Sequence, residues 1–576
     1  MIAVSFHGHA GWLHDADGDV AVVLCGAQGY EELCTQRGWY ELAQSLAERG
    51  FPTLRFDYAG CGDSLGSDTD HARLPAWQDS IAQAVAFVRE TLGVTKVVLV
   101  GLRLGALLAM QHALGDPAIA GVALLGAPVS GRGWAREMQM LAKVVGVPPE
   151  DAAPWPKLPD GFELGGFRYL DETLTSLAAL PKTADLLAVL AARHCLVLEK
   201  VPSAGSNRPP NHIALPFDGY DTYCIDRMFS VVPDSALRAV GDWLEQHWPQ
   251  PRSGPVTRRA LPNANLSGAG FAERLVQFGL GAALAGIICT PAAHSPAKAI
   301  IITNTGANHH IGWGRGTVEL ARGLAQNGIA TLRLDLAGLG NSATLPSRAS
   351  PPLYTADAVA DVQAAVDWLK AAGFAQIGVL GACSGAWLAL RSALADPRIG
   401  FAIMINLNRF VWPQGACIED AVRNVYRSSR AYASKATDPR SVLRLLRGEV
   451  AAGAIARALL GRAARKLKAL YRRAAMRLPL LNASTNIPRQ MLQQLAAQGT
   501  RALFIYGNHD GGLNDIELHF GSPQAVTKIT GMQFAKVCDA DHNFSPAWSR
   551  LALFEIVATF VGAQPQQEID APAPPP

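Results

Sequence analysis

The sequence predicts an α/β fold made of two tandem domains, each a mainly parallel sheet flanked by helices. Short β-branched runs alternate along the chain with helical patterns of about ten to fifteen residues, which is typical of βαβ units and of a parallel sheet covered on both faces. An internal repeat with a period of about 280 residues indicates duplication of a whole domain, because solenoid repeats are far shorter.

The repeat is clearest in two pairs of segments. Leu46–Asp57 (LAERGFPTLRFD) matches Leu324–Asp335 (LAQNGIATLRLD). Ala59–Ser64 (AGCGDS) then matches Ala337–Ser342 (AGLGNS) at the same spacing. Each half also carries extra sequence before its last predicted strands, where an insertion would form a cap over a site.

The domain boundaries follow from composition. The run Trp248–Pro255 is rich in proline and glycine, which is typical of a linker, and the C-terminal segment is rich in proline and glutamine, which indicates disorder. The predicted parts are a first domain at 1–250 with a cap at about 130–193, a linker at 251–265, a second domain at 266–562 with a cap at about 412–499, and a disordered tail at 563–576.

The composition is that of an ordinary globular protein. The formal net charge of +3 is too small to indicate a nucleic-acid partner. Nine cysteines without C-x-x-C pairs or histidine-rich spacing argue against a disulfide framework or a metal site, so we expect no metal or other cofactor and a reducing, cytoplasmic compartment. No signal peptide is expected at the N-terminus. The most apolar stretch, Leu275–Ala293, is broken by Gln277 and small residues, which predicts a strand pair rather than a membrane span.

The most informative motif is Gly381–Gly385 (GACSG). It follows an apolar run, Ile377–Leu380, and precedes a helical pattern, Ala386–Ala395. A G-x-nucleophile-x-G sequence at a strand-to-helix turn is the nucleophile elbow of α/β-hydrolases, where small neighbours relieve crowding around a strained backbone. Here Cys383 takes the place of the usual serine.

A cysteine nucleophile needs a base, and the base needs an acid that orients it. The fold orders them as nucleophile, acid and histidine. Asp510 directly follows a predicted strand, and His542 lies on a loop before the last amphipathic helix, so we expect Cys383, Asp510 and His542 to form a triad. Asp515 and Asp541 are the competing acids.

An oxyanion hole would take one backbone N–H from Ser384 and one from the loop after the strand near residue 300. Ala307 or Asn308 is the expected second donor, and His309 and His310 are expected to line the pocket.

Structural alternatives exist for each of these residues. Cys383 could be a small buried hydrophobe, and Cys289, Cys417 and Cys538 are expected to be ordinary packing residues. His509 is expected to be a solvated loop histidine.

The first half carries the same elbow without a nucleophile, Gly101–Gly105 (GLRLG). Arg103 replaces the cysteine, Ser203 falls at the acid position and Asp221 at the histidine position. Arginine stays protonated and cannot attack a carbonyl, so this domain is predicted to be a pseudo-enzyme. We expect an ion pair between Arg103 and Asp221; the alternative is that Arg103 binds an anionic ligand.

The second cap contains a basic amphipathic helix at about 457–478, in which leucines and alanines recur at helical spacing between lysines and arginines. It could touch anionic lipid or an acidic polymer. The favoured interpretation is a helix packed on the core with a solvated basic face.

Both halves resemble α/β-hydrolases of the serine aminopeptidase S33-like type. The second half is also similar to the exosortase A system-associated hydrolases of bacterial exopolysaccharide gene clusters, although those have one domain. The matching pieces are Leu332–Asp335, Gly338–Ser342, the elbow at Cys383 and Ala540–Ser545. The elbow cysteine is also similar to that of dienelactone hydrolases and polyhydroxyalkanoate synthases.

The resemblance implies attack by Cys383 on an acyl ester or thioester, an acyl-enzyme, and transfer of the acyl group to water or another acceptor. It does not imply peptidase activity. Three functions remain open: a hydrolase of a small-molecule or saccharide-linked acyl substrate, an acyltransferase to a saccharide or alcohol, and a non-catalytic ligand-binding or scaffold protein. The sequence leaves the oligomeric state undefined.

Overall fold

A computed structural model describes residues 1–149, 152–201, 209–224, 230–250, 261, 263–293, 296–413 and 486–562. It divides into two compact units, the first comprising Met1–Val147, Pro156–Ala375 and Asn543–Pro576, and the second comprising Pro148–Trp155 and Gln376–His542. This division does not follow the predicted boundary at 251–265, which stays a prediction. Ser203, Cys417, the basic segment 457–478 and the tail 563–576 lie outside the described residues.

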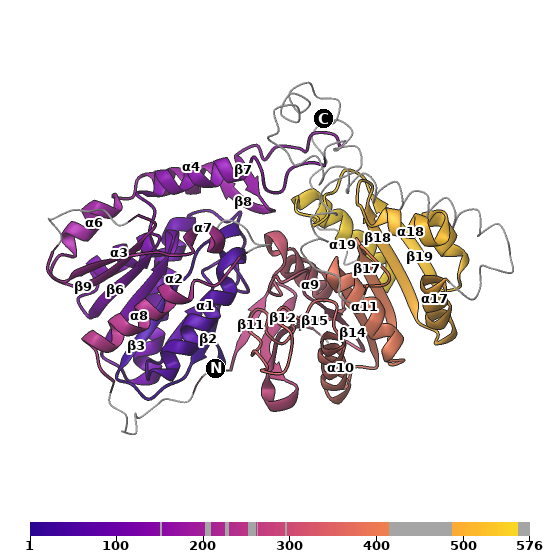
Figure 1. The fold of residues 1–576 in the computed structure, drawn as a ribbon, viewed down its shortest axis with the longest axis horizontal. Coiled ribbons are helices and arrows are strands. Elements are labelled where there is room, and N and C mark those ends of the chain that lie inside the picture. The colour runs from indigo at the N-terminus through magenta and orange to yellow at the C-terminus, as the bar shows by residue number, and fades with distance from the viewer. Residues whose placement is uncertain are drawn as a thin grey trace, which may run out of the picture. The chain divides into compact units, whose positions relative to one another are not determined.

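The first half contains an eight-stranded sheet of order β1-β2-β4-β3-β5-β6-β9-β10 (Figure 1). Its strands are β1 (Ile2–Phe6), β2 (His9–His14), β3 (Val20–Cys25), β4 (Thr53–Phe56), β5 (Lys96–Leu102), β6 (Ile119–Leu125), β9 (His194–Glu199) and β10 (His212–Pro216). Strands β1 and β2 form an antiparallel hairpin that joins β4, whereas the pairs from β4 to β10 are all parallel. The sheet is therefore mainly parallel.

Alternate strand residues build two cores on the two faces of this sheet. Val22 and Leu24 pack with helices α1 (Tyr30–Glu48) and α8 (Asp234–His247), whereas Ala21 and Val23 pack with α2 (Arg73–Leu92) and α3 (Leu104–Gly115). Successive side chains of a strand point to opposite faces, so a sheet buried on both sides reads as the continuous apolar runs seen in the sequence.

An insertion between β6 and β9 forms helices and a small hairpin. Its elements are α4 (Gly131–Leu141), β7 (Gly161–Leu164), β8 (Phe167–Leu170), α5 (Asp171–Ala178) and α6 (Thr183–Val189). Strands β7 and β8 pair only with each other, in antiparallel register from Gly161 with Leu170 to Leu164 with Phe167. After β10 comes the short helix α7 (Tyr220–Tyr223).

The second half repeats this strand order in two parts, with one additional edge strand, β11. The first unit holds β11 (Asn265–Gly268), β12 (Phe271–Phe278), β13 (Leu284–Pro291), β15 (Ala330–Asp335) and β14 (Lys298–Ile302) in that order, and the second holds β16 (Gln376–Ala382), β17 (Ile399–Ile405), β18 (Arg501–Gly507) and β19 (Met532–Val537). Strands β14 and β15 pair in parallel, as do β16 to β19. The predicted fold class, two mainly parallel sheets flanked by helices, is confirmed.

Helices connect these strands as the repeat predicts. They are η1 (Leu280–Ala282), η2 (Trp313–Arg315), α9 (Gly316–Gln326), α10 (Ala356–Ala371), α11 (Ser384–Ala395), α17 (Ile487–Ala497), α18 (Leu513–Phe520), η3 (Pro523–Lys528) and α19 (Ala547–Val561). The apolar stretch predicted to be a strand pair is the antiparallel hairpin of β12 and β13. No helix among the described residues is both long and apolar enough to span a membrane.

The duplicated loop after β4 and β15 is held by the same hydrogen bonds in both halves. The hydroxyl of Ser64 donates to the carbonyl of Asp57 at 2.5 Å, and the hydroxyl of Ser342 donates to that of Asp335 at 2.6 Å. The side chains of the same two aspartates accept the N–H groups of residues 63 and 341 at 2.8 and 2.9 Å. The matched motifs therefore encode one turn, built twice.

These two turns contact each other within the first unit. The contacts are reciprocal, because arginines of each half contact the turn of the other half. Arg55 donates to Asn341 at 3.0 Å, and the equivalent Arg333 forms an ion pair with Asp63, the equivalent of Asn341. Arg37 and its equivalent Arg315 likewise donate to the carbonyls of residues 342 and 64, at 3.1 and 2.9 Å. A contact in which residue i meets j while j meets i is isologous, as in a two-fold symmetric dimer.

A buried ionic cluster lies at the centre of this contact. The ring of His310, only 1% exposed, has its Nδ1 at 2.6 Å from Asp335 and its Nε2 at 2.6 Å from Asp63. Arg333 bridges Asp63 to Glu273, which lies 2.7 Å from its guanidinium. Burial alone would lower the pKa of His310, but the Asp335 and Asp63 carboxylates raise it to about 10. The expectation that His310 lines a catalytic pocket is therefore wrong, because both ring nitrogens are used inside this cluster.

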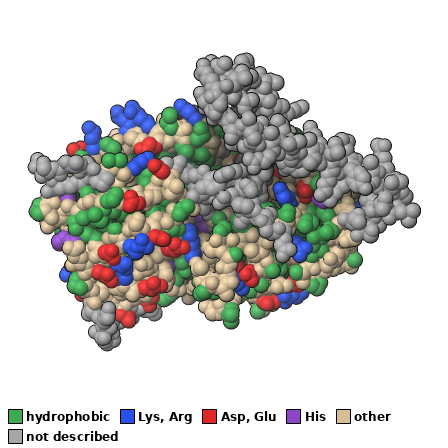
Figure 2. All heavy atoms as spheres, viewed as in Figure 1, with side chains coloured by type: hydrophobic (Ala, Val, Ile, Leu, Met, Phe, Trp, Pro, Cys, Tyr) green, Lys and Arg blue, Asp and Glu red, His purple; other side chains and the backbone are tan. Residues whose placement is uncertain are grey.

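The surface of the first half mixes charges of both signs. Figure 2 shows acidic and basic side chains interspersed over its described residues. Some are paired across elements: Arg49 of α1 contacts Asp242 and Glu245 of α8 at 2.7 and 3.1 Å. Such exposed pairs contribute about 1 kcal/mol or less each, so the buried cluster is the larger electrostatic determinant of stability.

Replacing His310 by glutamine is expected to destabilise the protein by about 3–5 kcal/mol near neutral pH, because two buried carboxylates lose the cation between them. In the wild type, stability should also fall as the pH rises from about 6.5 toward 10. Over that range the folded state keeps a proton on His310 that an unfolded histidine has lost, so the folded state binds more protons. His310→Gln should flatten this decline.

Urea unfolding midpoints measured across that pH range provide the test. His71→Gln is the matched control, because His71 also pairs with a carboxylate, Glu172 at 2.7 Å, but at the surface. An unchanged alkaline slope in His310→Gln would contradict the assignment of the buried proton.

Candidate active site

Cys383 occupies a strained strand-to-helix turn. It lies between β16 and α11 with φ 56° and ψ −115°, a conformation that side chains other than glycine rarely adopt. Its N–H donates to the carbonyl of Ile405 at the end of β17, at 2.9 Å. This is the geometry of a nucleophile elbow, which presents the side chain at the carboxyl edge of the strands.

Asp510 and His542 come from the loops after the next two strands. Asp510 follows β18, and His542 follows β19. Oδ2 of Asp510 lies 2.5 Å from Nδ1 of His542. The other carboxylate oxygen of Asp510 accepts the N–H of Gly512 at 2.7 Å, which fixes the rotamer of the acid. The carboxyl ends of parallel strands lie along one edge, so residues far apart in sequence converge there.

His542 also hydrogen-bonds Cys383, so the three residues form one connected set. Burial by itself would lower the pKa of His542. The Asp510 carboxylate and the Cys383 sulfur outweigh burial and raise that pKa well above its usual range. Asp515, one of the two competing acids, makes other contacts. Its carboxylate accepts the N–H of Phe410 at 3.0 Å and lies 3.7 Å from His519.

Three residues near this set escaped the sequence analysis. Asn408 donates from Nδ2 to the sulfur of Cys383 at 3.2 Å. Asn406, with φ 47°, donates to the carbonyl of His542 at 2.8 Å and accepts the N–H of Gly507 at 3.0 Å. Trp155, from the cap of the first half, donates its indole N–H to the carbonyl of Asp539 at 2.8 Å, in the loop that carries His542. Polar residues directly after β17 were the available signal for the two asparagines.

The expected oxyanion donors fall in different units. Ser384 begins α11 in the second unit, whereas Ala307 and Asn308 follow β14 in the first. The N–H of Asn308 already donates to the carbonyl of Thr305 at 3.2 Å, which leaves Ala307 as the better candidate. His309 is buried, and its ring lies 5.7 Å from that of His310. His509, expected to be a solvated loop histidine, is partly exposed and lies 3.3 Å from Asp539.

The first half has the same backbone conformation at its elbow, but an arginine stands at the position of the nucleophile. Arg103 has φ 54° and ψ −121°, and its N–H donates to Leu125 at 2.9 Å, as Cys383 does to Ile405. The close approach of α3 to the end of β3 requires glycine at position 105, because a Cβ there would lie 2.2 Å from the carbonyl oxygen of Cys25. The strained turn is thus a requirement of strand–helix packing in this fold.

The arginine is neutralised by carboxylates of its own domain. Arg103, only 4% exposed, contacts Glu31 at 2.6 Å, forms a second ion pair with Glu137, and donates to the carbonyl of Gly126 at 3.1 Å. The remaining oxygen of Glu31 accepts the indole N–H of Trp134 at 2.8 Å. An external anion is therefore unnecessary at Arg103, because Glu31 already fills that role.

The expected ion pair between Arg103 and Asp221 is wrong. Asp221 is 58% exposed and pairs with Lys200 at 2.5 Å instead. Its neighbour Tyr220 faces the site, with its ring 5.5 Å from the Arg103 guanidinium. The repeat in the sequence does not indicate the observed counter-ions, which come from α1 and α4. Among the described residues, no cluster of three or more His, Cys, Asp or Glu side chains is placed to hold a metal ion.

Arg103→Met should lower the free energy of unfolding by about 3–5 kcal/mol, because it leaves Glu31 buried without a cation. The double variant Arg103→Met/Glu31→Gln should recover much of that loss. Thermal and urea unfolding measure both. Arg89→Met is the control, since Arg89 pairs with the more exposed Asp116 at 2.8 Å. A single variant as stable as this control would contradict a structural role for the buried pair.

Two family models match the chain. Residues 19–159 match the model described as serine aminopeptidase, S33, and residues 300–553 match the alpha/beta hydrolase family. No curated protein matches the chain. Neither family match tests the resemblance to exosortase A system-associated hydrolases, which stays a prediction.

Solved structures similar to this chain cover about one of its halves. A cold-adapted esterase from an Arctic intertidal metagenomic library is 13% identical over 52% of this chain and 99% of its own, with a TM-score of 0.30. Dienelactone hydrolase from Anabaena variabilis is 13% identical over 52% and 100%, with a TM-score of 0.31. The thioesterase domain from the curacin biosynthetic pathway is 16% identical over 50% and 99%, with a TM-score of 0.29.

Those TM-scores are too low for the likenesses to support an argument. The fold rests instead on the two family matches, the two mainly parallel sheets and the two elbows. The chain is a pair of α/β-hydrolase domains in tandem.

Proposed function

We propose that the second half is an acyl ester or thioester hydrolase in which Cys383 is the nucleophile, His542 the base and Asp510 the orienting acid. The observation that carries this proposal is the connected set at the carboxyl edge of β16, β18 and β19: an elbow cysteine, a histidine bonded to it, and an aspartate 2.5 Å from that histidine. The arrangement supports nucleophilic acyl chemistry because each residue activates or orients the next.

In the first step the sulfur of Cys383 attacks the acyl carbonyl carbon, and the thiol proton passes to His542. The tetrahedral oxyanion collapses, the bond to the leaving alcohol or thiol breaks, and His542 returns the proton to that leaving group. The product is an acyl-thioester on Cys383. Asp510 stabilises the imidazolium formed in between and holds the tautomer that accepts the proton.

In the second step water takes the place of the leaving group. His542 removes a proton from the water, the resulting hydroxide attacks the thioester carbonyl, and the sulfur leaves with the proton that His542 returns. A carboxylic acid is released and Cys383 is regenerated. The N–H of Ser384, the residue after the nucleophile, is the proposed donor to the oxyanion in both steps.

Two asparagines are proposed as positioning residues. Asn408 holds the Cys383 sulfur through the bond at 3.2 Å, so the thiol keeps one rotamer as it faces His542. Asn406 ties the His542 backbone to the end of β18, the strand that leads to Asp510. Asn408 therefore positions the nucleophile and Asn406 the base relative to the acid, which supports catalysis because displacements of about 1 Å can cost about 10²-fold in rate.

Cys383→Ala should abolish the burst of p-nitrophenol released from p-nitrophenyl acetate and the mass increase that marks an acetylated enzyme. The matched control is Cys538→Ala, because Cys538 lies in the same unit but is exposed and outside the triad. The control should retain the burst. A wild-type protein that shows neither burst nor acylation, or a burst retained in Cys383→Ala, would sink the proposal.

Asp510→Asn should lower the pKa of His542, because the Asp510 carboxylate is the foremost influence that raises it. The turnover rate should fall by about 10⁴-fold, since an asparagine favours the wrong histidine tautomer. The first effect can be measured by ¹⁵N NMR titration of the His542 ring. Asp515→Asn is the control and should leave that titration unchanged; the reverse result would identify Asp515 as the acid.

A further inference from the structure

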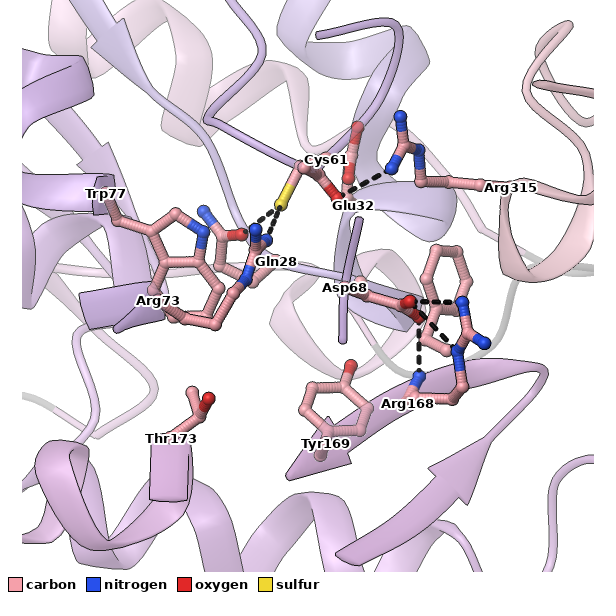
Figure 3. A pocket seen from close by; sticks show the side chains of 13 residues that line it. Gln28, Glu32, Cys61, Asp68, Arg73, Trp77, Arg168, Tyr169, Thr173 and Arg315 are labelled. Atoms are coloured by element: carbon pink, nitrogen blue, oxygen red, sulfur yellow. Dashed lines mark hydrogen bonds and ion pairs between the residues drawn. The ribbon is translucent and has the colours of Figure 1, made fainter. Parts of the chain in front are cut away.

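A cavity in the first unit is lined by no residue of either elbow. It opens among loops of the first half and the hairpin β7–β8, and its walls include Gln28, Arg73, Trp77, Tyr169 and Arg315 (Figure 3). The space open to the centres of water-sized molecules is about 30 Å³, more than the ~10–15 Å³ that one ordered water needs. The cavity can therefore hold a group of a few heavy atoms.

Two buried guanidinium groups line this cavity, and neither has a carboxylate partner among the described residues. Arg73 is 3% exposed; its polar contact is to the sulfur of Cys61 at 3.4 Å, and it stacks over Trp77 at 5.1 Å. Arg315 is bonded only by carbonyls, those of residues 60, 62, 64 and 66, at 2.8 to 3.0 Å. Buried charges are normally paired with an opposite charge, so two unmatched cations at one cavity indicate a missing anion.

Two further donors at this cavity have no acceptor among the described residues. The amide Nε2 of Gln28, a side chain only 1% exposed, and the indole Nε1 of Trp77, 4% exposed, are both buried and unpartnered. Figure 3 shows Gln28, Arg73 and Trp77 grouped around the Cys61 sulfur. The Gln28 carbonyl is held by Cys61 at 3.0 Å, which turns the amide nitrogen away from that contact. A buried unsatisfied donor costs about 1–3 kcal/mol, so a ligand that accepts from both would recover that cost.

The acidic side chains of the cavity do not supply the missing charge. Asp68 is occupied by Arg168, which lies 2.5 Å away and makes further bonds to the same carboxylate. Glu32 also lines the cavity, but it makes no ion pair with Arg73 or Arg315 within the described part of the chain. Burial, followed by the neighbouring Asp57 carboxylate, raises the pKa of Glu32, which disfavours its charged form.

We propose that this cavity binds the carboxylate of a small organic acid. Arg73, Gln28 and Trp77 donate to the carboxylate oxygens, and Phe167, Trp77 and Tyr169 contact the apolar part of the acid. A planar guanidinium matches a planar carboxylate, and the narrow space favours a flat anion over a tetrahedral one. Apart from Arg315, the lining residues belong to the half that lacks a nucleophile, so the site gives that half a binding role beyond the hydrolase activity proposed for the other.

The test is an NMR titration of the full chain labelled with ¹⁵N at its 12 tryptophans. The Trp77 indole signal is identified by its loss in Trp77→Phe. Sodium acetate and sodium propionate should shift it saturably, with dissociation constants of about 1 mM for ligands of so few atoms, whereas sodium chloride at equal ionic strength should not. Gln28→Leu should weaken binding by about tenfold, the effect of one lost hydrogen bond to a charged group.

The matched control is Trp243, whose indole nitrogen is also buried and unpartnered but belongs to α8, on the opposite face of the sheet. Its signal, identified by Trp243→Phe, should not respond to either acid. Arg73→Met should abolish binding; if that variant does not fold, Gln28→Leu still decides. No saturable shift with either acid, an equal response to chloride or phosphate, or unchanged affinity in Gln28→Leu would overturn the proposal.

Discussion

The contact between the two duplicated turns depends on one buried carboxylate, that of Asp63. It accepts from Arg333 and from His310 at once, and His310 passes the link on to Asp335 of the other half. Removing these charges from water is costly, and the attraction between them offsets that cost only while every partner is present. The cluster therefore makes the first unit cooperative: a change at any member exposes the others to an unpaired buried charge.

The exchanged contacts around this cluster explain why two domains with different residues can share one interface. Arg55 and Arg333 occupy equivalent positions, yet one meets an asparagine and the other an aspartate. Duplication produces a symmetric contact first, and later substitutions can then differ on the two sides. The elbows have diverged in the same way. Their backbone angles agree within a few degrees, so packing has preserved the turn whether or not a nucleophile sits on it.

Much of this architecture could be predicted from the sequence because it depends on local patterns. The strands β5, β9, β16 and β18, the elbow at Cys383 and the order of acid and histidine all follow from runs, turns and spacing. The errors concern long-range pairing. Arg103 pairs with Glu31 and Glu137, which lie 72 and 34 residues away, and His310 pairs with Asp63 across the duplication. Asn406 and Asn408 were missed since an asparagine after a strand gives no sign of which loop it will hold.

Buried arginines in the first unit are of two kinds, those with a carboxylate partner and those without one. Arg103 and Arg333 each have a carboxylate within ion-pair distance, so their charges are matched inside the fold. Among the described residues, Arg55, Arg73 and Arg315 have none: Arg55 bonds His14 and Asn341, whereas Arg73 and Arg315 line a common cavity with two unsatisfied donors. At the first elbow the charge of Arg103 is matched by Glu31, whereas the cavity lined by Arg73 and Arg315 holds two buried donors that lack an acceptor among the described residues. A binding role for the first half is therefore better supported at this cavity than at the elbow, because a ligand would satisfy donors that the fold leaves unsatisfied.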